Sequence, residues 1–186
     1  MQLKKANAIL ALLSTLLLLV HLGYSCFEYL TFYYNPGLTK LLAIPFMVVV
    51  CLHAVCGMAI VFFLKDGTRM DLYPRENMRT ILQRISAALI FPLLILHINT
   101  FSLLQKSAAA GHTAFVILLM LSGPLFFATV LTHTATSVSR ALITLGALRS
   151  EKTLRVVDLI VYVICAAAFA AVSFAVVRGQ IIMFMH

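Results

Sequence analysis

Residues 41–64 read LLAIPFMVVVCLHAVCGMAIVFFL, an apolar run interrupted by one histidine, His53. A helix crosses a bilayer core with roughly 20 apolar residues, so this run is long enough to span a membrane. A buried polar ring that lacks a partner costs several kcal/mol in hydrocarbon. His53 therefore needs a partner, and the nature of that partner bears on what the protein does.

The whole chain has the same apolar character. It has 186 residues, of which 62% are hydrophobic and only 11% charged, and its mean hydropathy is +1.04. Such a composition is typical of an integral membrane protein. We predict an all-α membrane protein, one domain over residues 1–186, in which five transmembrane helices form a bundle. The predicted spans are about 8–32, 41–64, 81–104, 114–136 and 156–177.

Charge predicts the orientation of this bundle. Eleven of the 14 basic residues fall on one side of the predicted spans: Lys4, Lys5, Lys65, Arg69, Arg75, Arg79, Arg84, Arg140, Arg149, Lys152 and Arg155. Only Lys40, Lys106 and Arg178 fall on the other side. The positive-inside rule therefore predicts a cytoplasmic N-terminus and a C-terminus outside. The basic residues lack interleaved aromatic side chains, so we expect no nucleic-acid partner.

Four connections join the predicted spans. Residues 33–40, YYNPGLTK, carry an Asn-Pro-Gly turn signal. The longest polar stretch is 65–79, whose mixed charges suit either a cytoplasmic contact surface or a solvated loop. The other two connections are 105–112 and 146–155, and helical periodicity continues beyond the fourth span through 135–148.

The first four spans each contain one histidine: His21, His53, His97 and His133. A lone histidine in a membrane most often bonds a neighbouring helix, but four in consecutive spans indicate a shared partner, which we interpret as a bound metal cofactor. A single zinc ion needs four ligands at one tetrahedral point and second-shell carboxylates, and the spans hold only one or two acids. Haem held by two histidines instead needs opposed rings and small residues that admit the porphyrin.

Small residues accompany the histidines of the second and fourth spans, and partly that of the third. Those near His53 are Ala54, Cys56 and Gly57, and those on the helical stripe of His133 are Thr129 and Ser137, followed by Arg140. In the third span, Ser86 lies within about 20° of the line of His97 at 100° per residue, but so does the bulky Ile90.

The depths of the histidines also differ. His97 lies outward of its span's centre, His133 well inward, and His21 and His53 near the middle. Two haems at different depths, one outer and one inner, would make an electron path through the membrane.

Four segments carry a resemblance to a known family. LHAVCGM around His53 is similar to an H-A-x-x-G ligand segment, and LQRISAALIFPLLILH, ending at His97, is similar to a Q/H-R-[IV]-[ST]-G start followed about a dozen residues later by a ligand histidine. LLVH ending at His21 and LTHTATSVSRAL around His133 resemble the other two ligand segments. The chain thus resembles, over nearly its whole length, the single-chain, five-helix, di-haem cytochrome b subunit of the succinate dehydrogenase and fumarate reductase family.

This resemblance implies a pairing and a set of partners. It pairs His21 with His97 as iron ligands of an outer haem b, and His53 with His133 for an inner haem b. It implies a membrane anchor in a bacterial cytoplasmic membrane that carries electrons between an iron–sulfur subunit and a quinone, usually menaquinone. The dicarboxylate chemistry would belong to a flavoprotein subunit. The predicted depths do not fit the inner pairing, because His53 is predicted to lie roughly 10 Å shallower than His133 if both spans stand upright.

Further polar residues are candidates for secondary sites. Glu28, seven residues after His21 and on the same helical face, is a candidate for quinone-linked proton transfer, or else an interface residue that bonds a neighbouring helix. Arg84, Ser86 and Arg140 are candidates for binding haem propionates or quinone, the alternative for the two arginines being anchoring at the inner face.

Two functions of other classes stay open at this point. One is a transporter whose histidines and Glu28 bind a proton or a metal ion. The other is a haem-free structural anchor, in which the histidines serve as bonds between helices. An optical spectrum distinguishes both from a cytochrome b.

Overall fold

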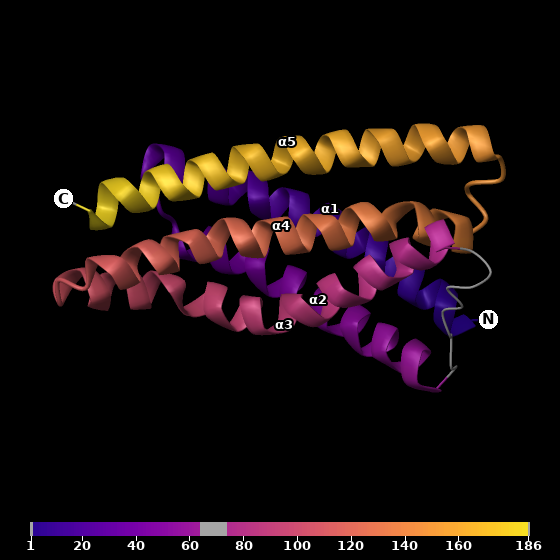
Figure 1. Cartoon of the computed structure of the whole chain (residues 1–186), viewed down its shortest axis with the longest axis horizontal. Helices are drawn as coiled ribbons and strands as arrows, with labels where there is room; N and C mark the ends of the chain where they lie inside the picture. Colours follow the sequence, from indigo (N-terminus) through magenta and orange to yellow (C-terminus); the bar gives the residue numbers. More distant parts are fainter. Residues whose placement is uncertain (1, 64–73, 186) are drawn as a thin grey trace.

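A computed structural model describes residues 2–63 and 74–185 of the chain. In this part the chain folds entirely into helices: α1 (Gln2–Thr31), α2 (Pro36–Phe63), α3 (Pro74–Ala109), α4 (Thr113–Thr144) and α5 (Glu151–Phe184). All five are long and apolar enough to cross a membrane. The predicted all-α bundle is thus confirmed. The two termini lie at opposite ends of it (Figure 1), whereas the side on which each end lies stays a prediction.

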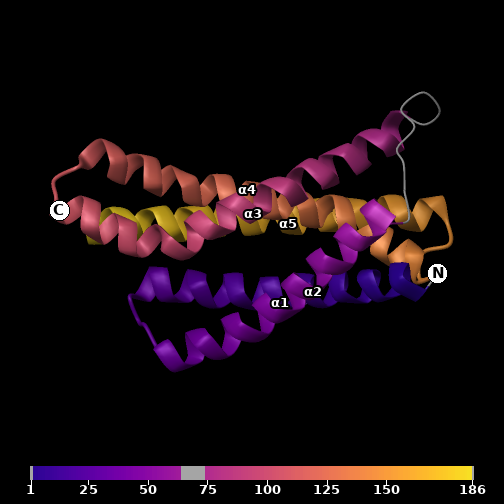
Figure 2. The same cartoon turned by 90° about the horizontal axis from the view of Figure 1, so that it is seen from below.

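The helix α4 is the centre of the bundle. It packs against α3, α5 and α1, and its buried residues run along most of its length. The α1–α2 hairpin lies on one side of the other three helices (Figure 2). Within the described ranges, no Cα atom of α2 comes within 8 Å of one in α3, α4 or α5, so its backbone packs on α1 alone.

The exposed and buried surfaces are those of a membrane protein. Large apolar side chains point outward, including Phe91, which is 70% exposed, and Leu41, which is 66% exposed. Small polar side chains are buried between helices instead, such as Thr136 and Ser139, the latter only 1% exposed. Lipid covers the outer faces of such helices, while small residues let their backbones approach closely.

Each described turn is closed by a residue suited to it. Asn35 caps α2, because its side-chain oxygen accepts hydrogen bonds from the amides of Gly37 and Leu38, and Pro36 fills the first helical position. Gly111 and Gly146 end α3 and α4 at positive φ, where a side chain would be strained.

The helices extend beyond the predicted spans. Most of the predicted connection 105–112 is helical, because α3 continues to Ala109. The connection predicted for 65–79 lies outside the described residues up to 73, and from Pro74 onward it is the first turn of α3 rather than a loop. The continuation of the fourth helix, predicted through 148, is confirmed as far as Thr144, where α4 ends. Hydropathy marks the lipid-embedded part of a helix, whereas the helix itself continues through the polar interface.

The contact between α5 and α1 generates a stability prediction. A methyl group added to Gly179 would lie 2.6 Å from Cδ1 and 3.2 Å from the backbone oxygen of Tyr29. Gly179→Ala should therefore force the two helices apart and lower the free energy of unfolding by about 1–3 kcal/mol. The measurement is unfolding in detergent.

Gly23→Ala is the matched control, because nothing lies within 4 Å of the added methyl there and alanine favours the helix. Equal stability of the two variants would contradict the close packing of α1 on α5.

Candidate functional site

Two histidines face each other across the gap between α2 and α4. The ring centroids of His53 and His133 are 6.2 Å apart, and their planes make an angle of 61°. Both rings are largely withdrawn from the surface, although the backbones of their helices stay more than 8 Å apart. The two side chains therefore bridge a separation that the helices themselves do not close.

The tautomer of His133 is set by α3. Its Nδ1 atom lies 3.1 Å from the backbone oxygen of Gln83 and 3.3 Å from the hydroxyl of Ser86. A carbonyl oxygen only accepts hydrogen bonds, so Nδ1 carries the proton and Nε2 keeps a lone pair. Such a second bond is what orients and polarises a histidine that binds a metal. His133 is therefore prepared to be a ligand through Nε2.

The separation of this pair fits two ligands of one metal ion. A metal–imidazole bond is about 2 Å long, so rings on opposite sides of one ion have centroids about 6 Å apart. The 6.2 Å between His53 and His133 agrees with this value. Opposed imidazoles are the axial ligands of a b-type haem iron, so the residues present fit this group.

His21 and His97, the predicted outer pair, have aromatic rings as neighbours. His21 and His97 are close enough to interact electrostatically. The ring of His21 stacks on Phe46 of α2 at 5.5 Å, and that of His97 stacks on Phe126 of α4 at 4.6 Å between centroids. The structure thus brings His53 and His133 together, whereas the pairing of His21 with His97 stays a prediction.

The depths of the pairs correct one expectation. His53 lies 17 residues after Pro36, where α2 begins, and His133 lies 20 residues after Thr113, where α4 begins. The expected 10 Å offset shrinks to three residues, or roughly 4.5 Å, because α2 begins five residues before the predicted span. The expectation had placed the start of that span at 41.

The outer pair shows the same agreement in depth. His21 lies ten residues before the end of α1, and His97 lies twelve before the end of α3. Measured from the same end of the bundle, the two pairs are separated by seven to eight residues, or roughly 11 Å along the helix axis. They form two levels within the bundle.

Glu28 lies at the end of the bundle that the charge pattern predicts to face outward. The hydroxyl of Thr39 in α2 lies 2.7 Å from its Oε1 atom and 2.8 Å from the backbone oxygen of Asn35, to either of which it can donate. Glu28 also interacts electrostatically with His21. The carboxylate thus bonds the neighbouring helix, as the interface reading expects, and stands close to the outer pair.

The other candidate residues lie at the level of His133 or below it. Arg140 donates a hydrogen bond to the side chain of Gln83 at 3.1 Å, and that side chain donates to Ser137 at 2.9 Å. Ser86 is 5% exposed and contacts His133. Arg84 is half-buried one residue after Gln83. The role of Gln83 was missed, because a backbone oxygen, which every residue has, carries no sequence signal.

An ion pair at the inner end of the bundle was also missed. Arg79 of α3 binds both carboxylate oxygens of Asp158 in α5 at 2.9 Å, and it donates to the hydroxyl of Ser139 and to two backbone oxygens of α4. From the sequence, Arg79 was predicted only to be one of the inner basic residues, and Asp158 was not a candidate for any site. A lone acid near the end of a span was the one signal that a partner exists.

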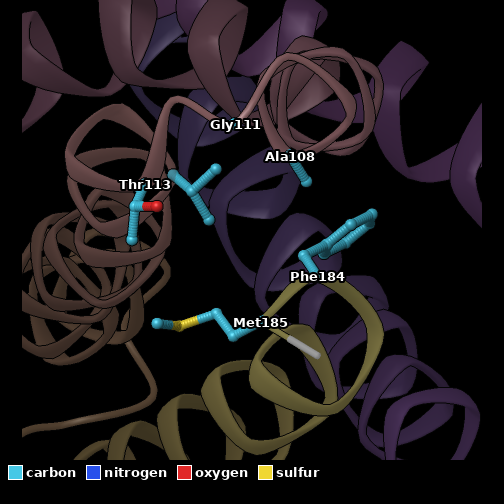
Figure 3. A pocket seen from close by; sticks show the side chains of 6 residues that line it. Ala108, Gly111, Thr113, Phe184 and Met185 are labelled. Carbon is cyan, nitrogen blue, oxygen red and sulfur yellow. The ribbon is translucent and has the colours of Figure 1, made fainter.

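Within residues 2–63 and 74–185, no three His, Cys, Asp or Glu side chains come together as a metal-binding group. Apart from the histidines, a hollow of about 260 Å³ lies at the turn between α3 and α4, lined by Ala108, Gly111, Thr113, Val116, Phe184 and Met185 (Figure 3). Its lining includes no candidate site residue.

Comparisons with known proteins bring no assignment: no protein-family model, curated protein or solved structure matches this chain.

The ion pair between Arg79 and Asp158 leads to a second stability prediction. The two side chains are 15% and 18% exposed, so Asp158→Ala leaves a largely buried charge without its carboxylate. We expect the free energy of unfolding to fall by about 3 kcal/mol, as measured by denaturation in detergent.

Glu151→Ala serves as the control, since it breaks the Arg155–Glu151 pair, whose side chains are 78% and 75% exposed, and exposed pairs contribute little. A loss of stability no greater for Asp158→Ala than for Glu151→Ala would contradict this role.

Proposed function

We propose that the chain is a membrane-anchor cytochrome b that carries electrons through two b haems between an iron–sulfur subunit and a quinone. It would serve a succinate:quinone or quinol:fumarate oxidoreductase in a bacterial cytoplasmic membrane. Menaquinone is the quinone that the family resemblance favours. The dicarboxylate reaction would take place on a separate flavoprotein subunit, so this chain is the quinone-linked part of the enzyme.

One observation carries the proposal: the ring centroids of His53 and His133 lie 6.2 Å apart, between two helices whose Cα atoms stay more than 8 Å apart. Two imidazoles that only bonded each other would stand at hydrogen-bond distance, with ring centroids closer together than this. The separation instead matches a metal ion between them. The bond from His133 to Gln83 supports the same reading, because it leaves Nε2 available.

In this proposal, residues at the two depths of the bundle would have different roles. His53 and His133 would hold the inner iron, and His21 and His97 would hold the outer one. A b haem with two imidazole ligands supplies one-electron transfer without binding substrate. Arg84, Arg140 and Ser86 lie beside the inner pair, where the arginines can neutralise propionates or orient a quinone.

Glu28 would accept a proton that is released when a quinol is oxidised. Oxidation of a quinol releases two protons with two electrons, and a carboxylate near the outer pair can accept one of the protons. The hydroxyl of Thr39, 2.7 Å from its Oε1 atom, can hold Glu28 at the turn of the α1–α2 hairpin. The inner basic loops would face the iron–sulfur subunit.

An optical spectrum of the purified chain tests the central claim. We expect reduced b-type bands with two haems per chain. His53→Ala and His97→Ala should each lower the content to one haem, because each removes one axial ligand of a different iron.

His112→Ala is the control, because His112 is an exposed residue in the turn before α4 and should leave both haems in place. A colourless wild-type protein would instead favour a transporter or a haem-free anchor. Full haem content in both histidine variants would refute the ligand assignment.

Glu28→Gln tests the proton role in the same preparation. The amide keeps the shape of the side chain but cannot accept a proton, so we expect a short-chain naphthoquinol to reduce the haems at least about tenfold more slowly. Haem content should stay unchanged. Glu151→Gln, at the exposed start of α5, is the matched control. An unaltered rate in Glu28→Gln would leave Glu28 as an interface residue only.

A further inference from the structure

The inner pair has one nitrogen without a partner. Among the described residues, five buried side-chain polar atoms form no hydrogen bond, and two of them, Nδ1 of His53 and Oδ1 of Asn7, belong to neighbouring helices. A buried donor or acceptor without a partner costs free energy. These two unpaired atoms, one a possible donor and the other an acceptor, lie on helices that pack against each other.

The positions of the two residues support this. The ring of His53 interacts with the main chain of Asn7, although no hydrogen bond of good geometry forms. The Oδ1 atom of Asn7 lies 3.9 Å from the place that a methyl group on Gly57 would take. Gly57 is one turn from His53 on the same face of α2. The side chain of Asn7 thus lies over the stripe of α2 that carries His53.

We propose that Asn7 is a positioning residue for His53: its side-chain oxygen accepts the Nδ1 proton and leaves Nε2 to meet the inner iron. This inference rests on the proposed function. It gives His53 the same arrangement that His133 has, where a carbonyl oxygen of Gln83 accepts from Nδ1 at 3.1 Å. A hydrogen bond between the two atoms would satisfy both of them at once.

The bond sets an electronic property of the site. An acceptor at Nδ1 makes the imidazole a stronger donor to its metal, and a stronger donor favours ferric over ferrous iron. A negatively charged acceptor does so more strongly than a neutral one. Asn7 should therefore influence the midpoint potential of the inner haem and leave that of the outer haem unchanged.

Two variants of Asn7 test the proposal in the purified full chain. Asn7→Asp keeps the acceptor and adds a negative charge, so it should retain both haems. It should also favour ferric over ferrous inner haem about tenfold, which lowers the inner midpoint potential by about 59 mV for one electron. Asn7→Leu removes the acceptor and should weaken inner haem binding about ten- to hundredfold, with altered ferric electron paramagnetic resonance g-values. The inner signal is identified as the one that His53→Ala removes.

Asn99→Asp and Asn99→Leu are the matched controls, because Asn99 is an exposed asparagine of α3 that bonds only its own helix at Ile95. Retention of the outer haem shows that each variant is folded. An inner potential and haem affinity unchanged in both Asn7 variants would overturn the proposal while leaving the function intact. An upward shift in Asn7→Asp would also overturn it, since it would mean that the carboxylate does not accept the Nδ1 proton of His53. Wild-type protein without haem would overturn the proposed function, and this inference with it.

Discussion

An imidazole buried between apolar helices needs a partner at each ring nitrogen, and this requirement organises the inner half of the bundle. His133 meets it on one side through the backbone oxygen of Gln83. The side chain of Gln83 is in turn held by Ser137 and Arg140, so three atoms of one residue attach α3 to α4. The position of a candidate ligand thus follows from a fixed helix contact rather than from a mobile loop.

The two helices that carry His53 and His133, α2 and α4, form the two walls of the inner site and differ in how many helices they contact. Arg79 links α3, α4 and α5 below His133 through one guanidinium group. The wall that carries His53 belongs to α2, whose backbone packs on α1 alone. A bound group between the walls would therefore contribute to the fold as well as to function, because it would hold α2 against the rest of the bundle.

Sequence reasoning predicted the features that depend on local pattern. Apolar length predicted the five helices, and the histidines at helical positions in four of them predicted a shared site. The extent of each helix was underestimated, because a span defined by hydropathy stops where Ser, Thr and Arg begin, as in the stretch of α4 that ends at Thr144. Those same polar residues make the contacts between helices.

Features that depend on tertiary contact were not predictable in this way. Arg79 and Asp158 are 79 residues apart in the sequence and meet only because α3 and α5 flank α4. The bond from His133 to Gln83 uses a backbone atom, which every residue has, so no residue type signals it. The pairing of the histidines followed from a family resemblance, whereas their common depth required the true helix ends.

The peripheral place of α2 has a consequence for biogenesis. A helix attached along a single edge can slide sideways in the bilayer without breaking the contacts among α1, α4 and α5. Under the proposed function, a haem would then be able to enter laterally, from the lipid, after the remaining helices have assembled. Maturation of the protein would end with the closing of this last helix, and chains that fail to acquire the macrocycle would present an open flank to membrane quality-control proteases.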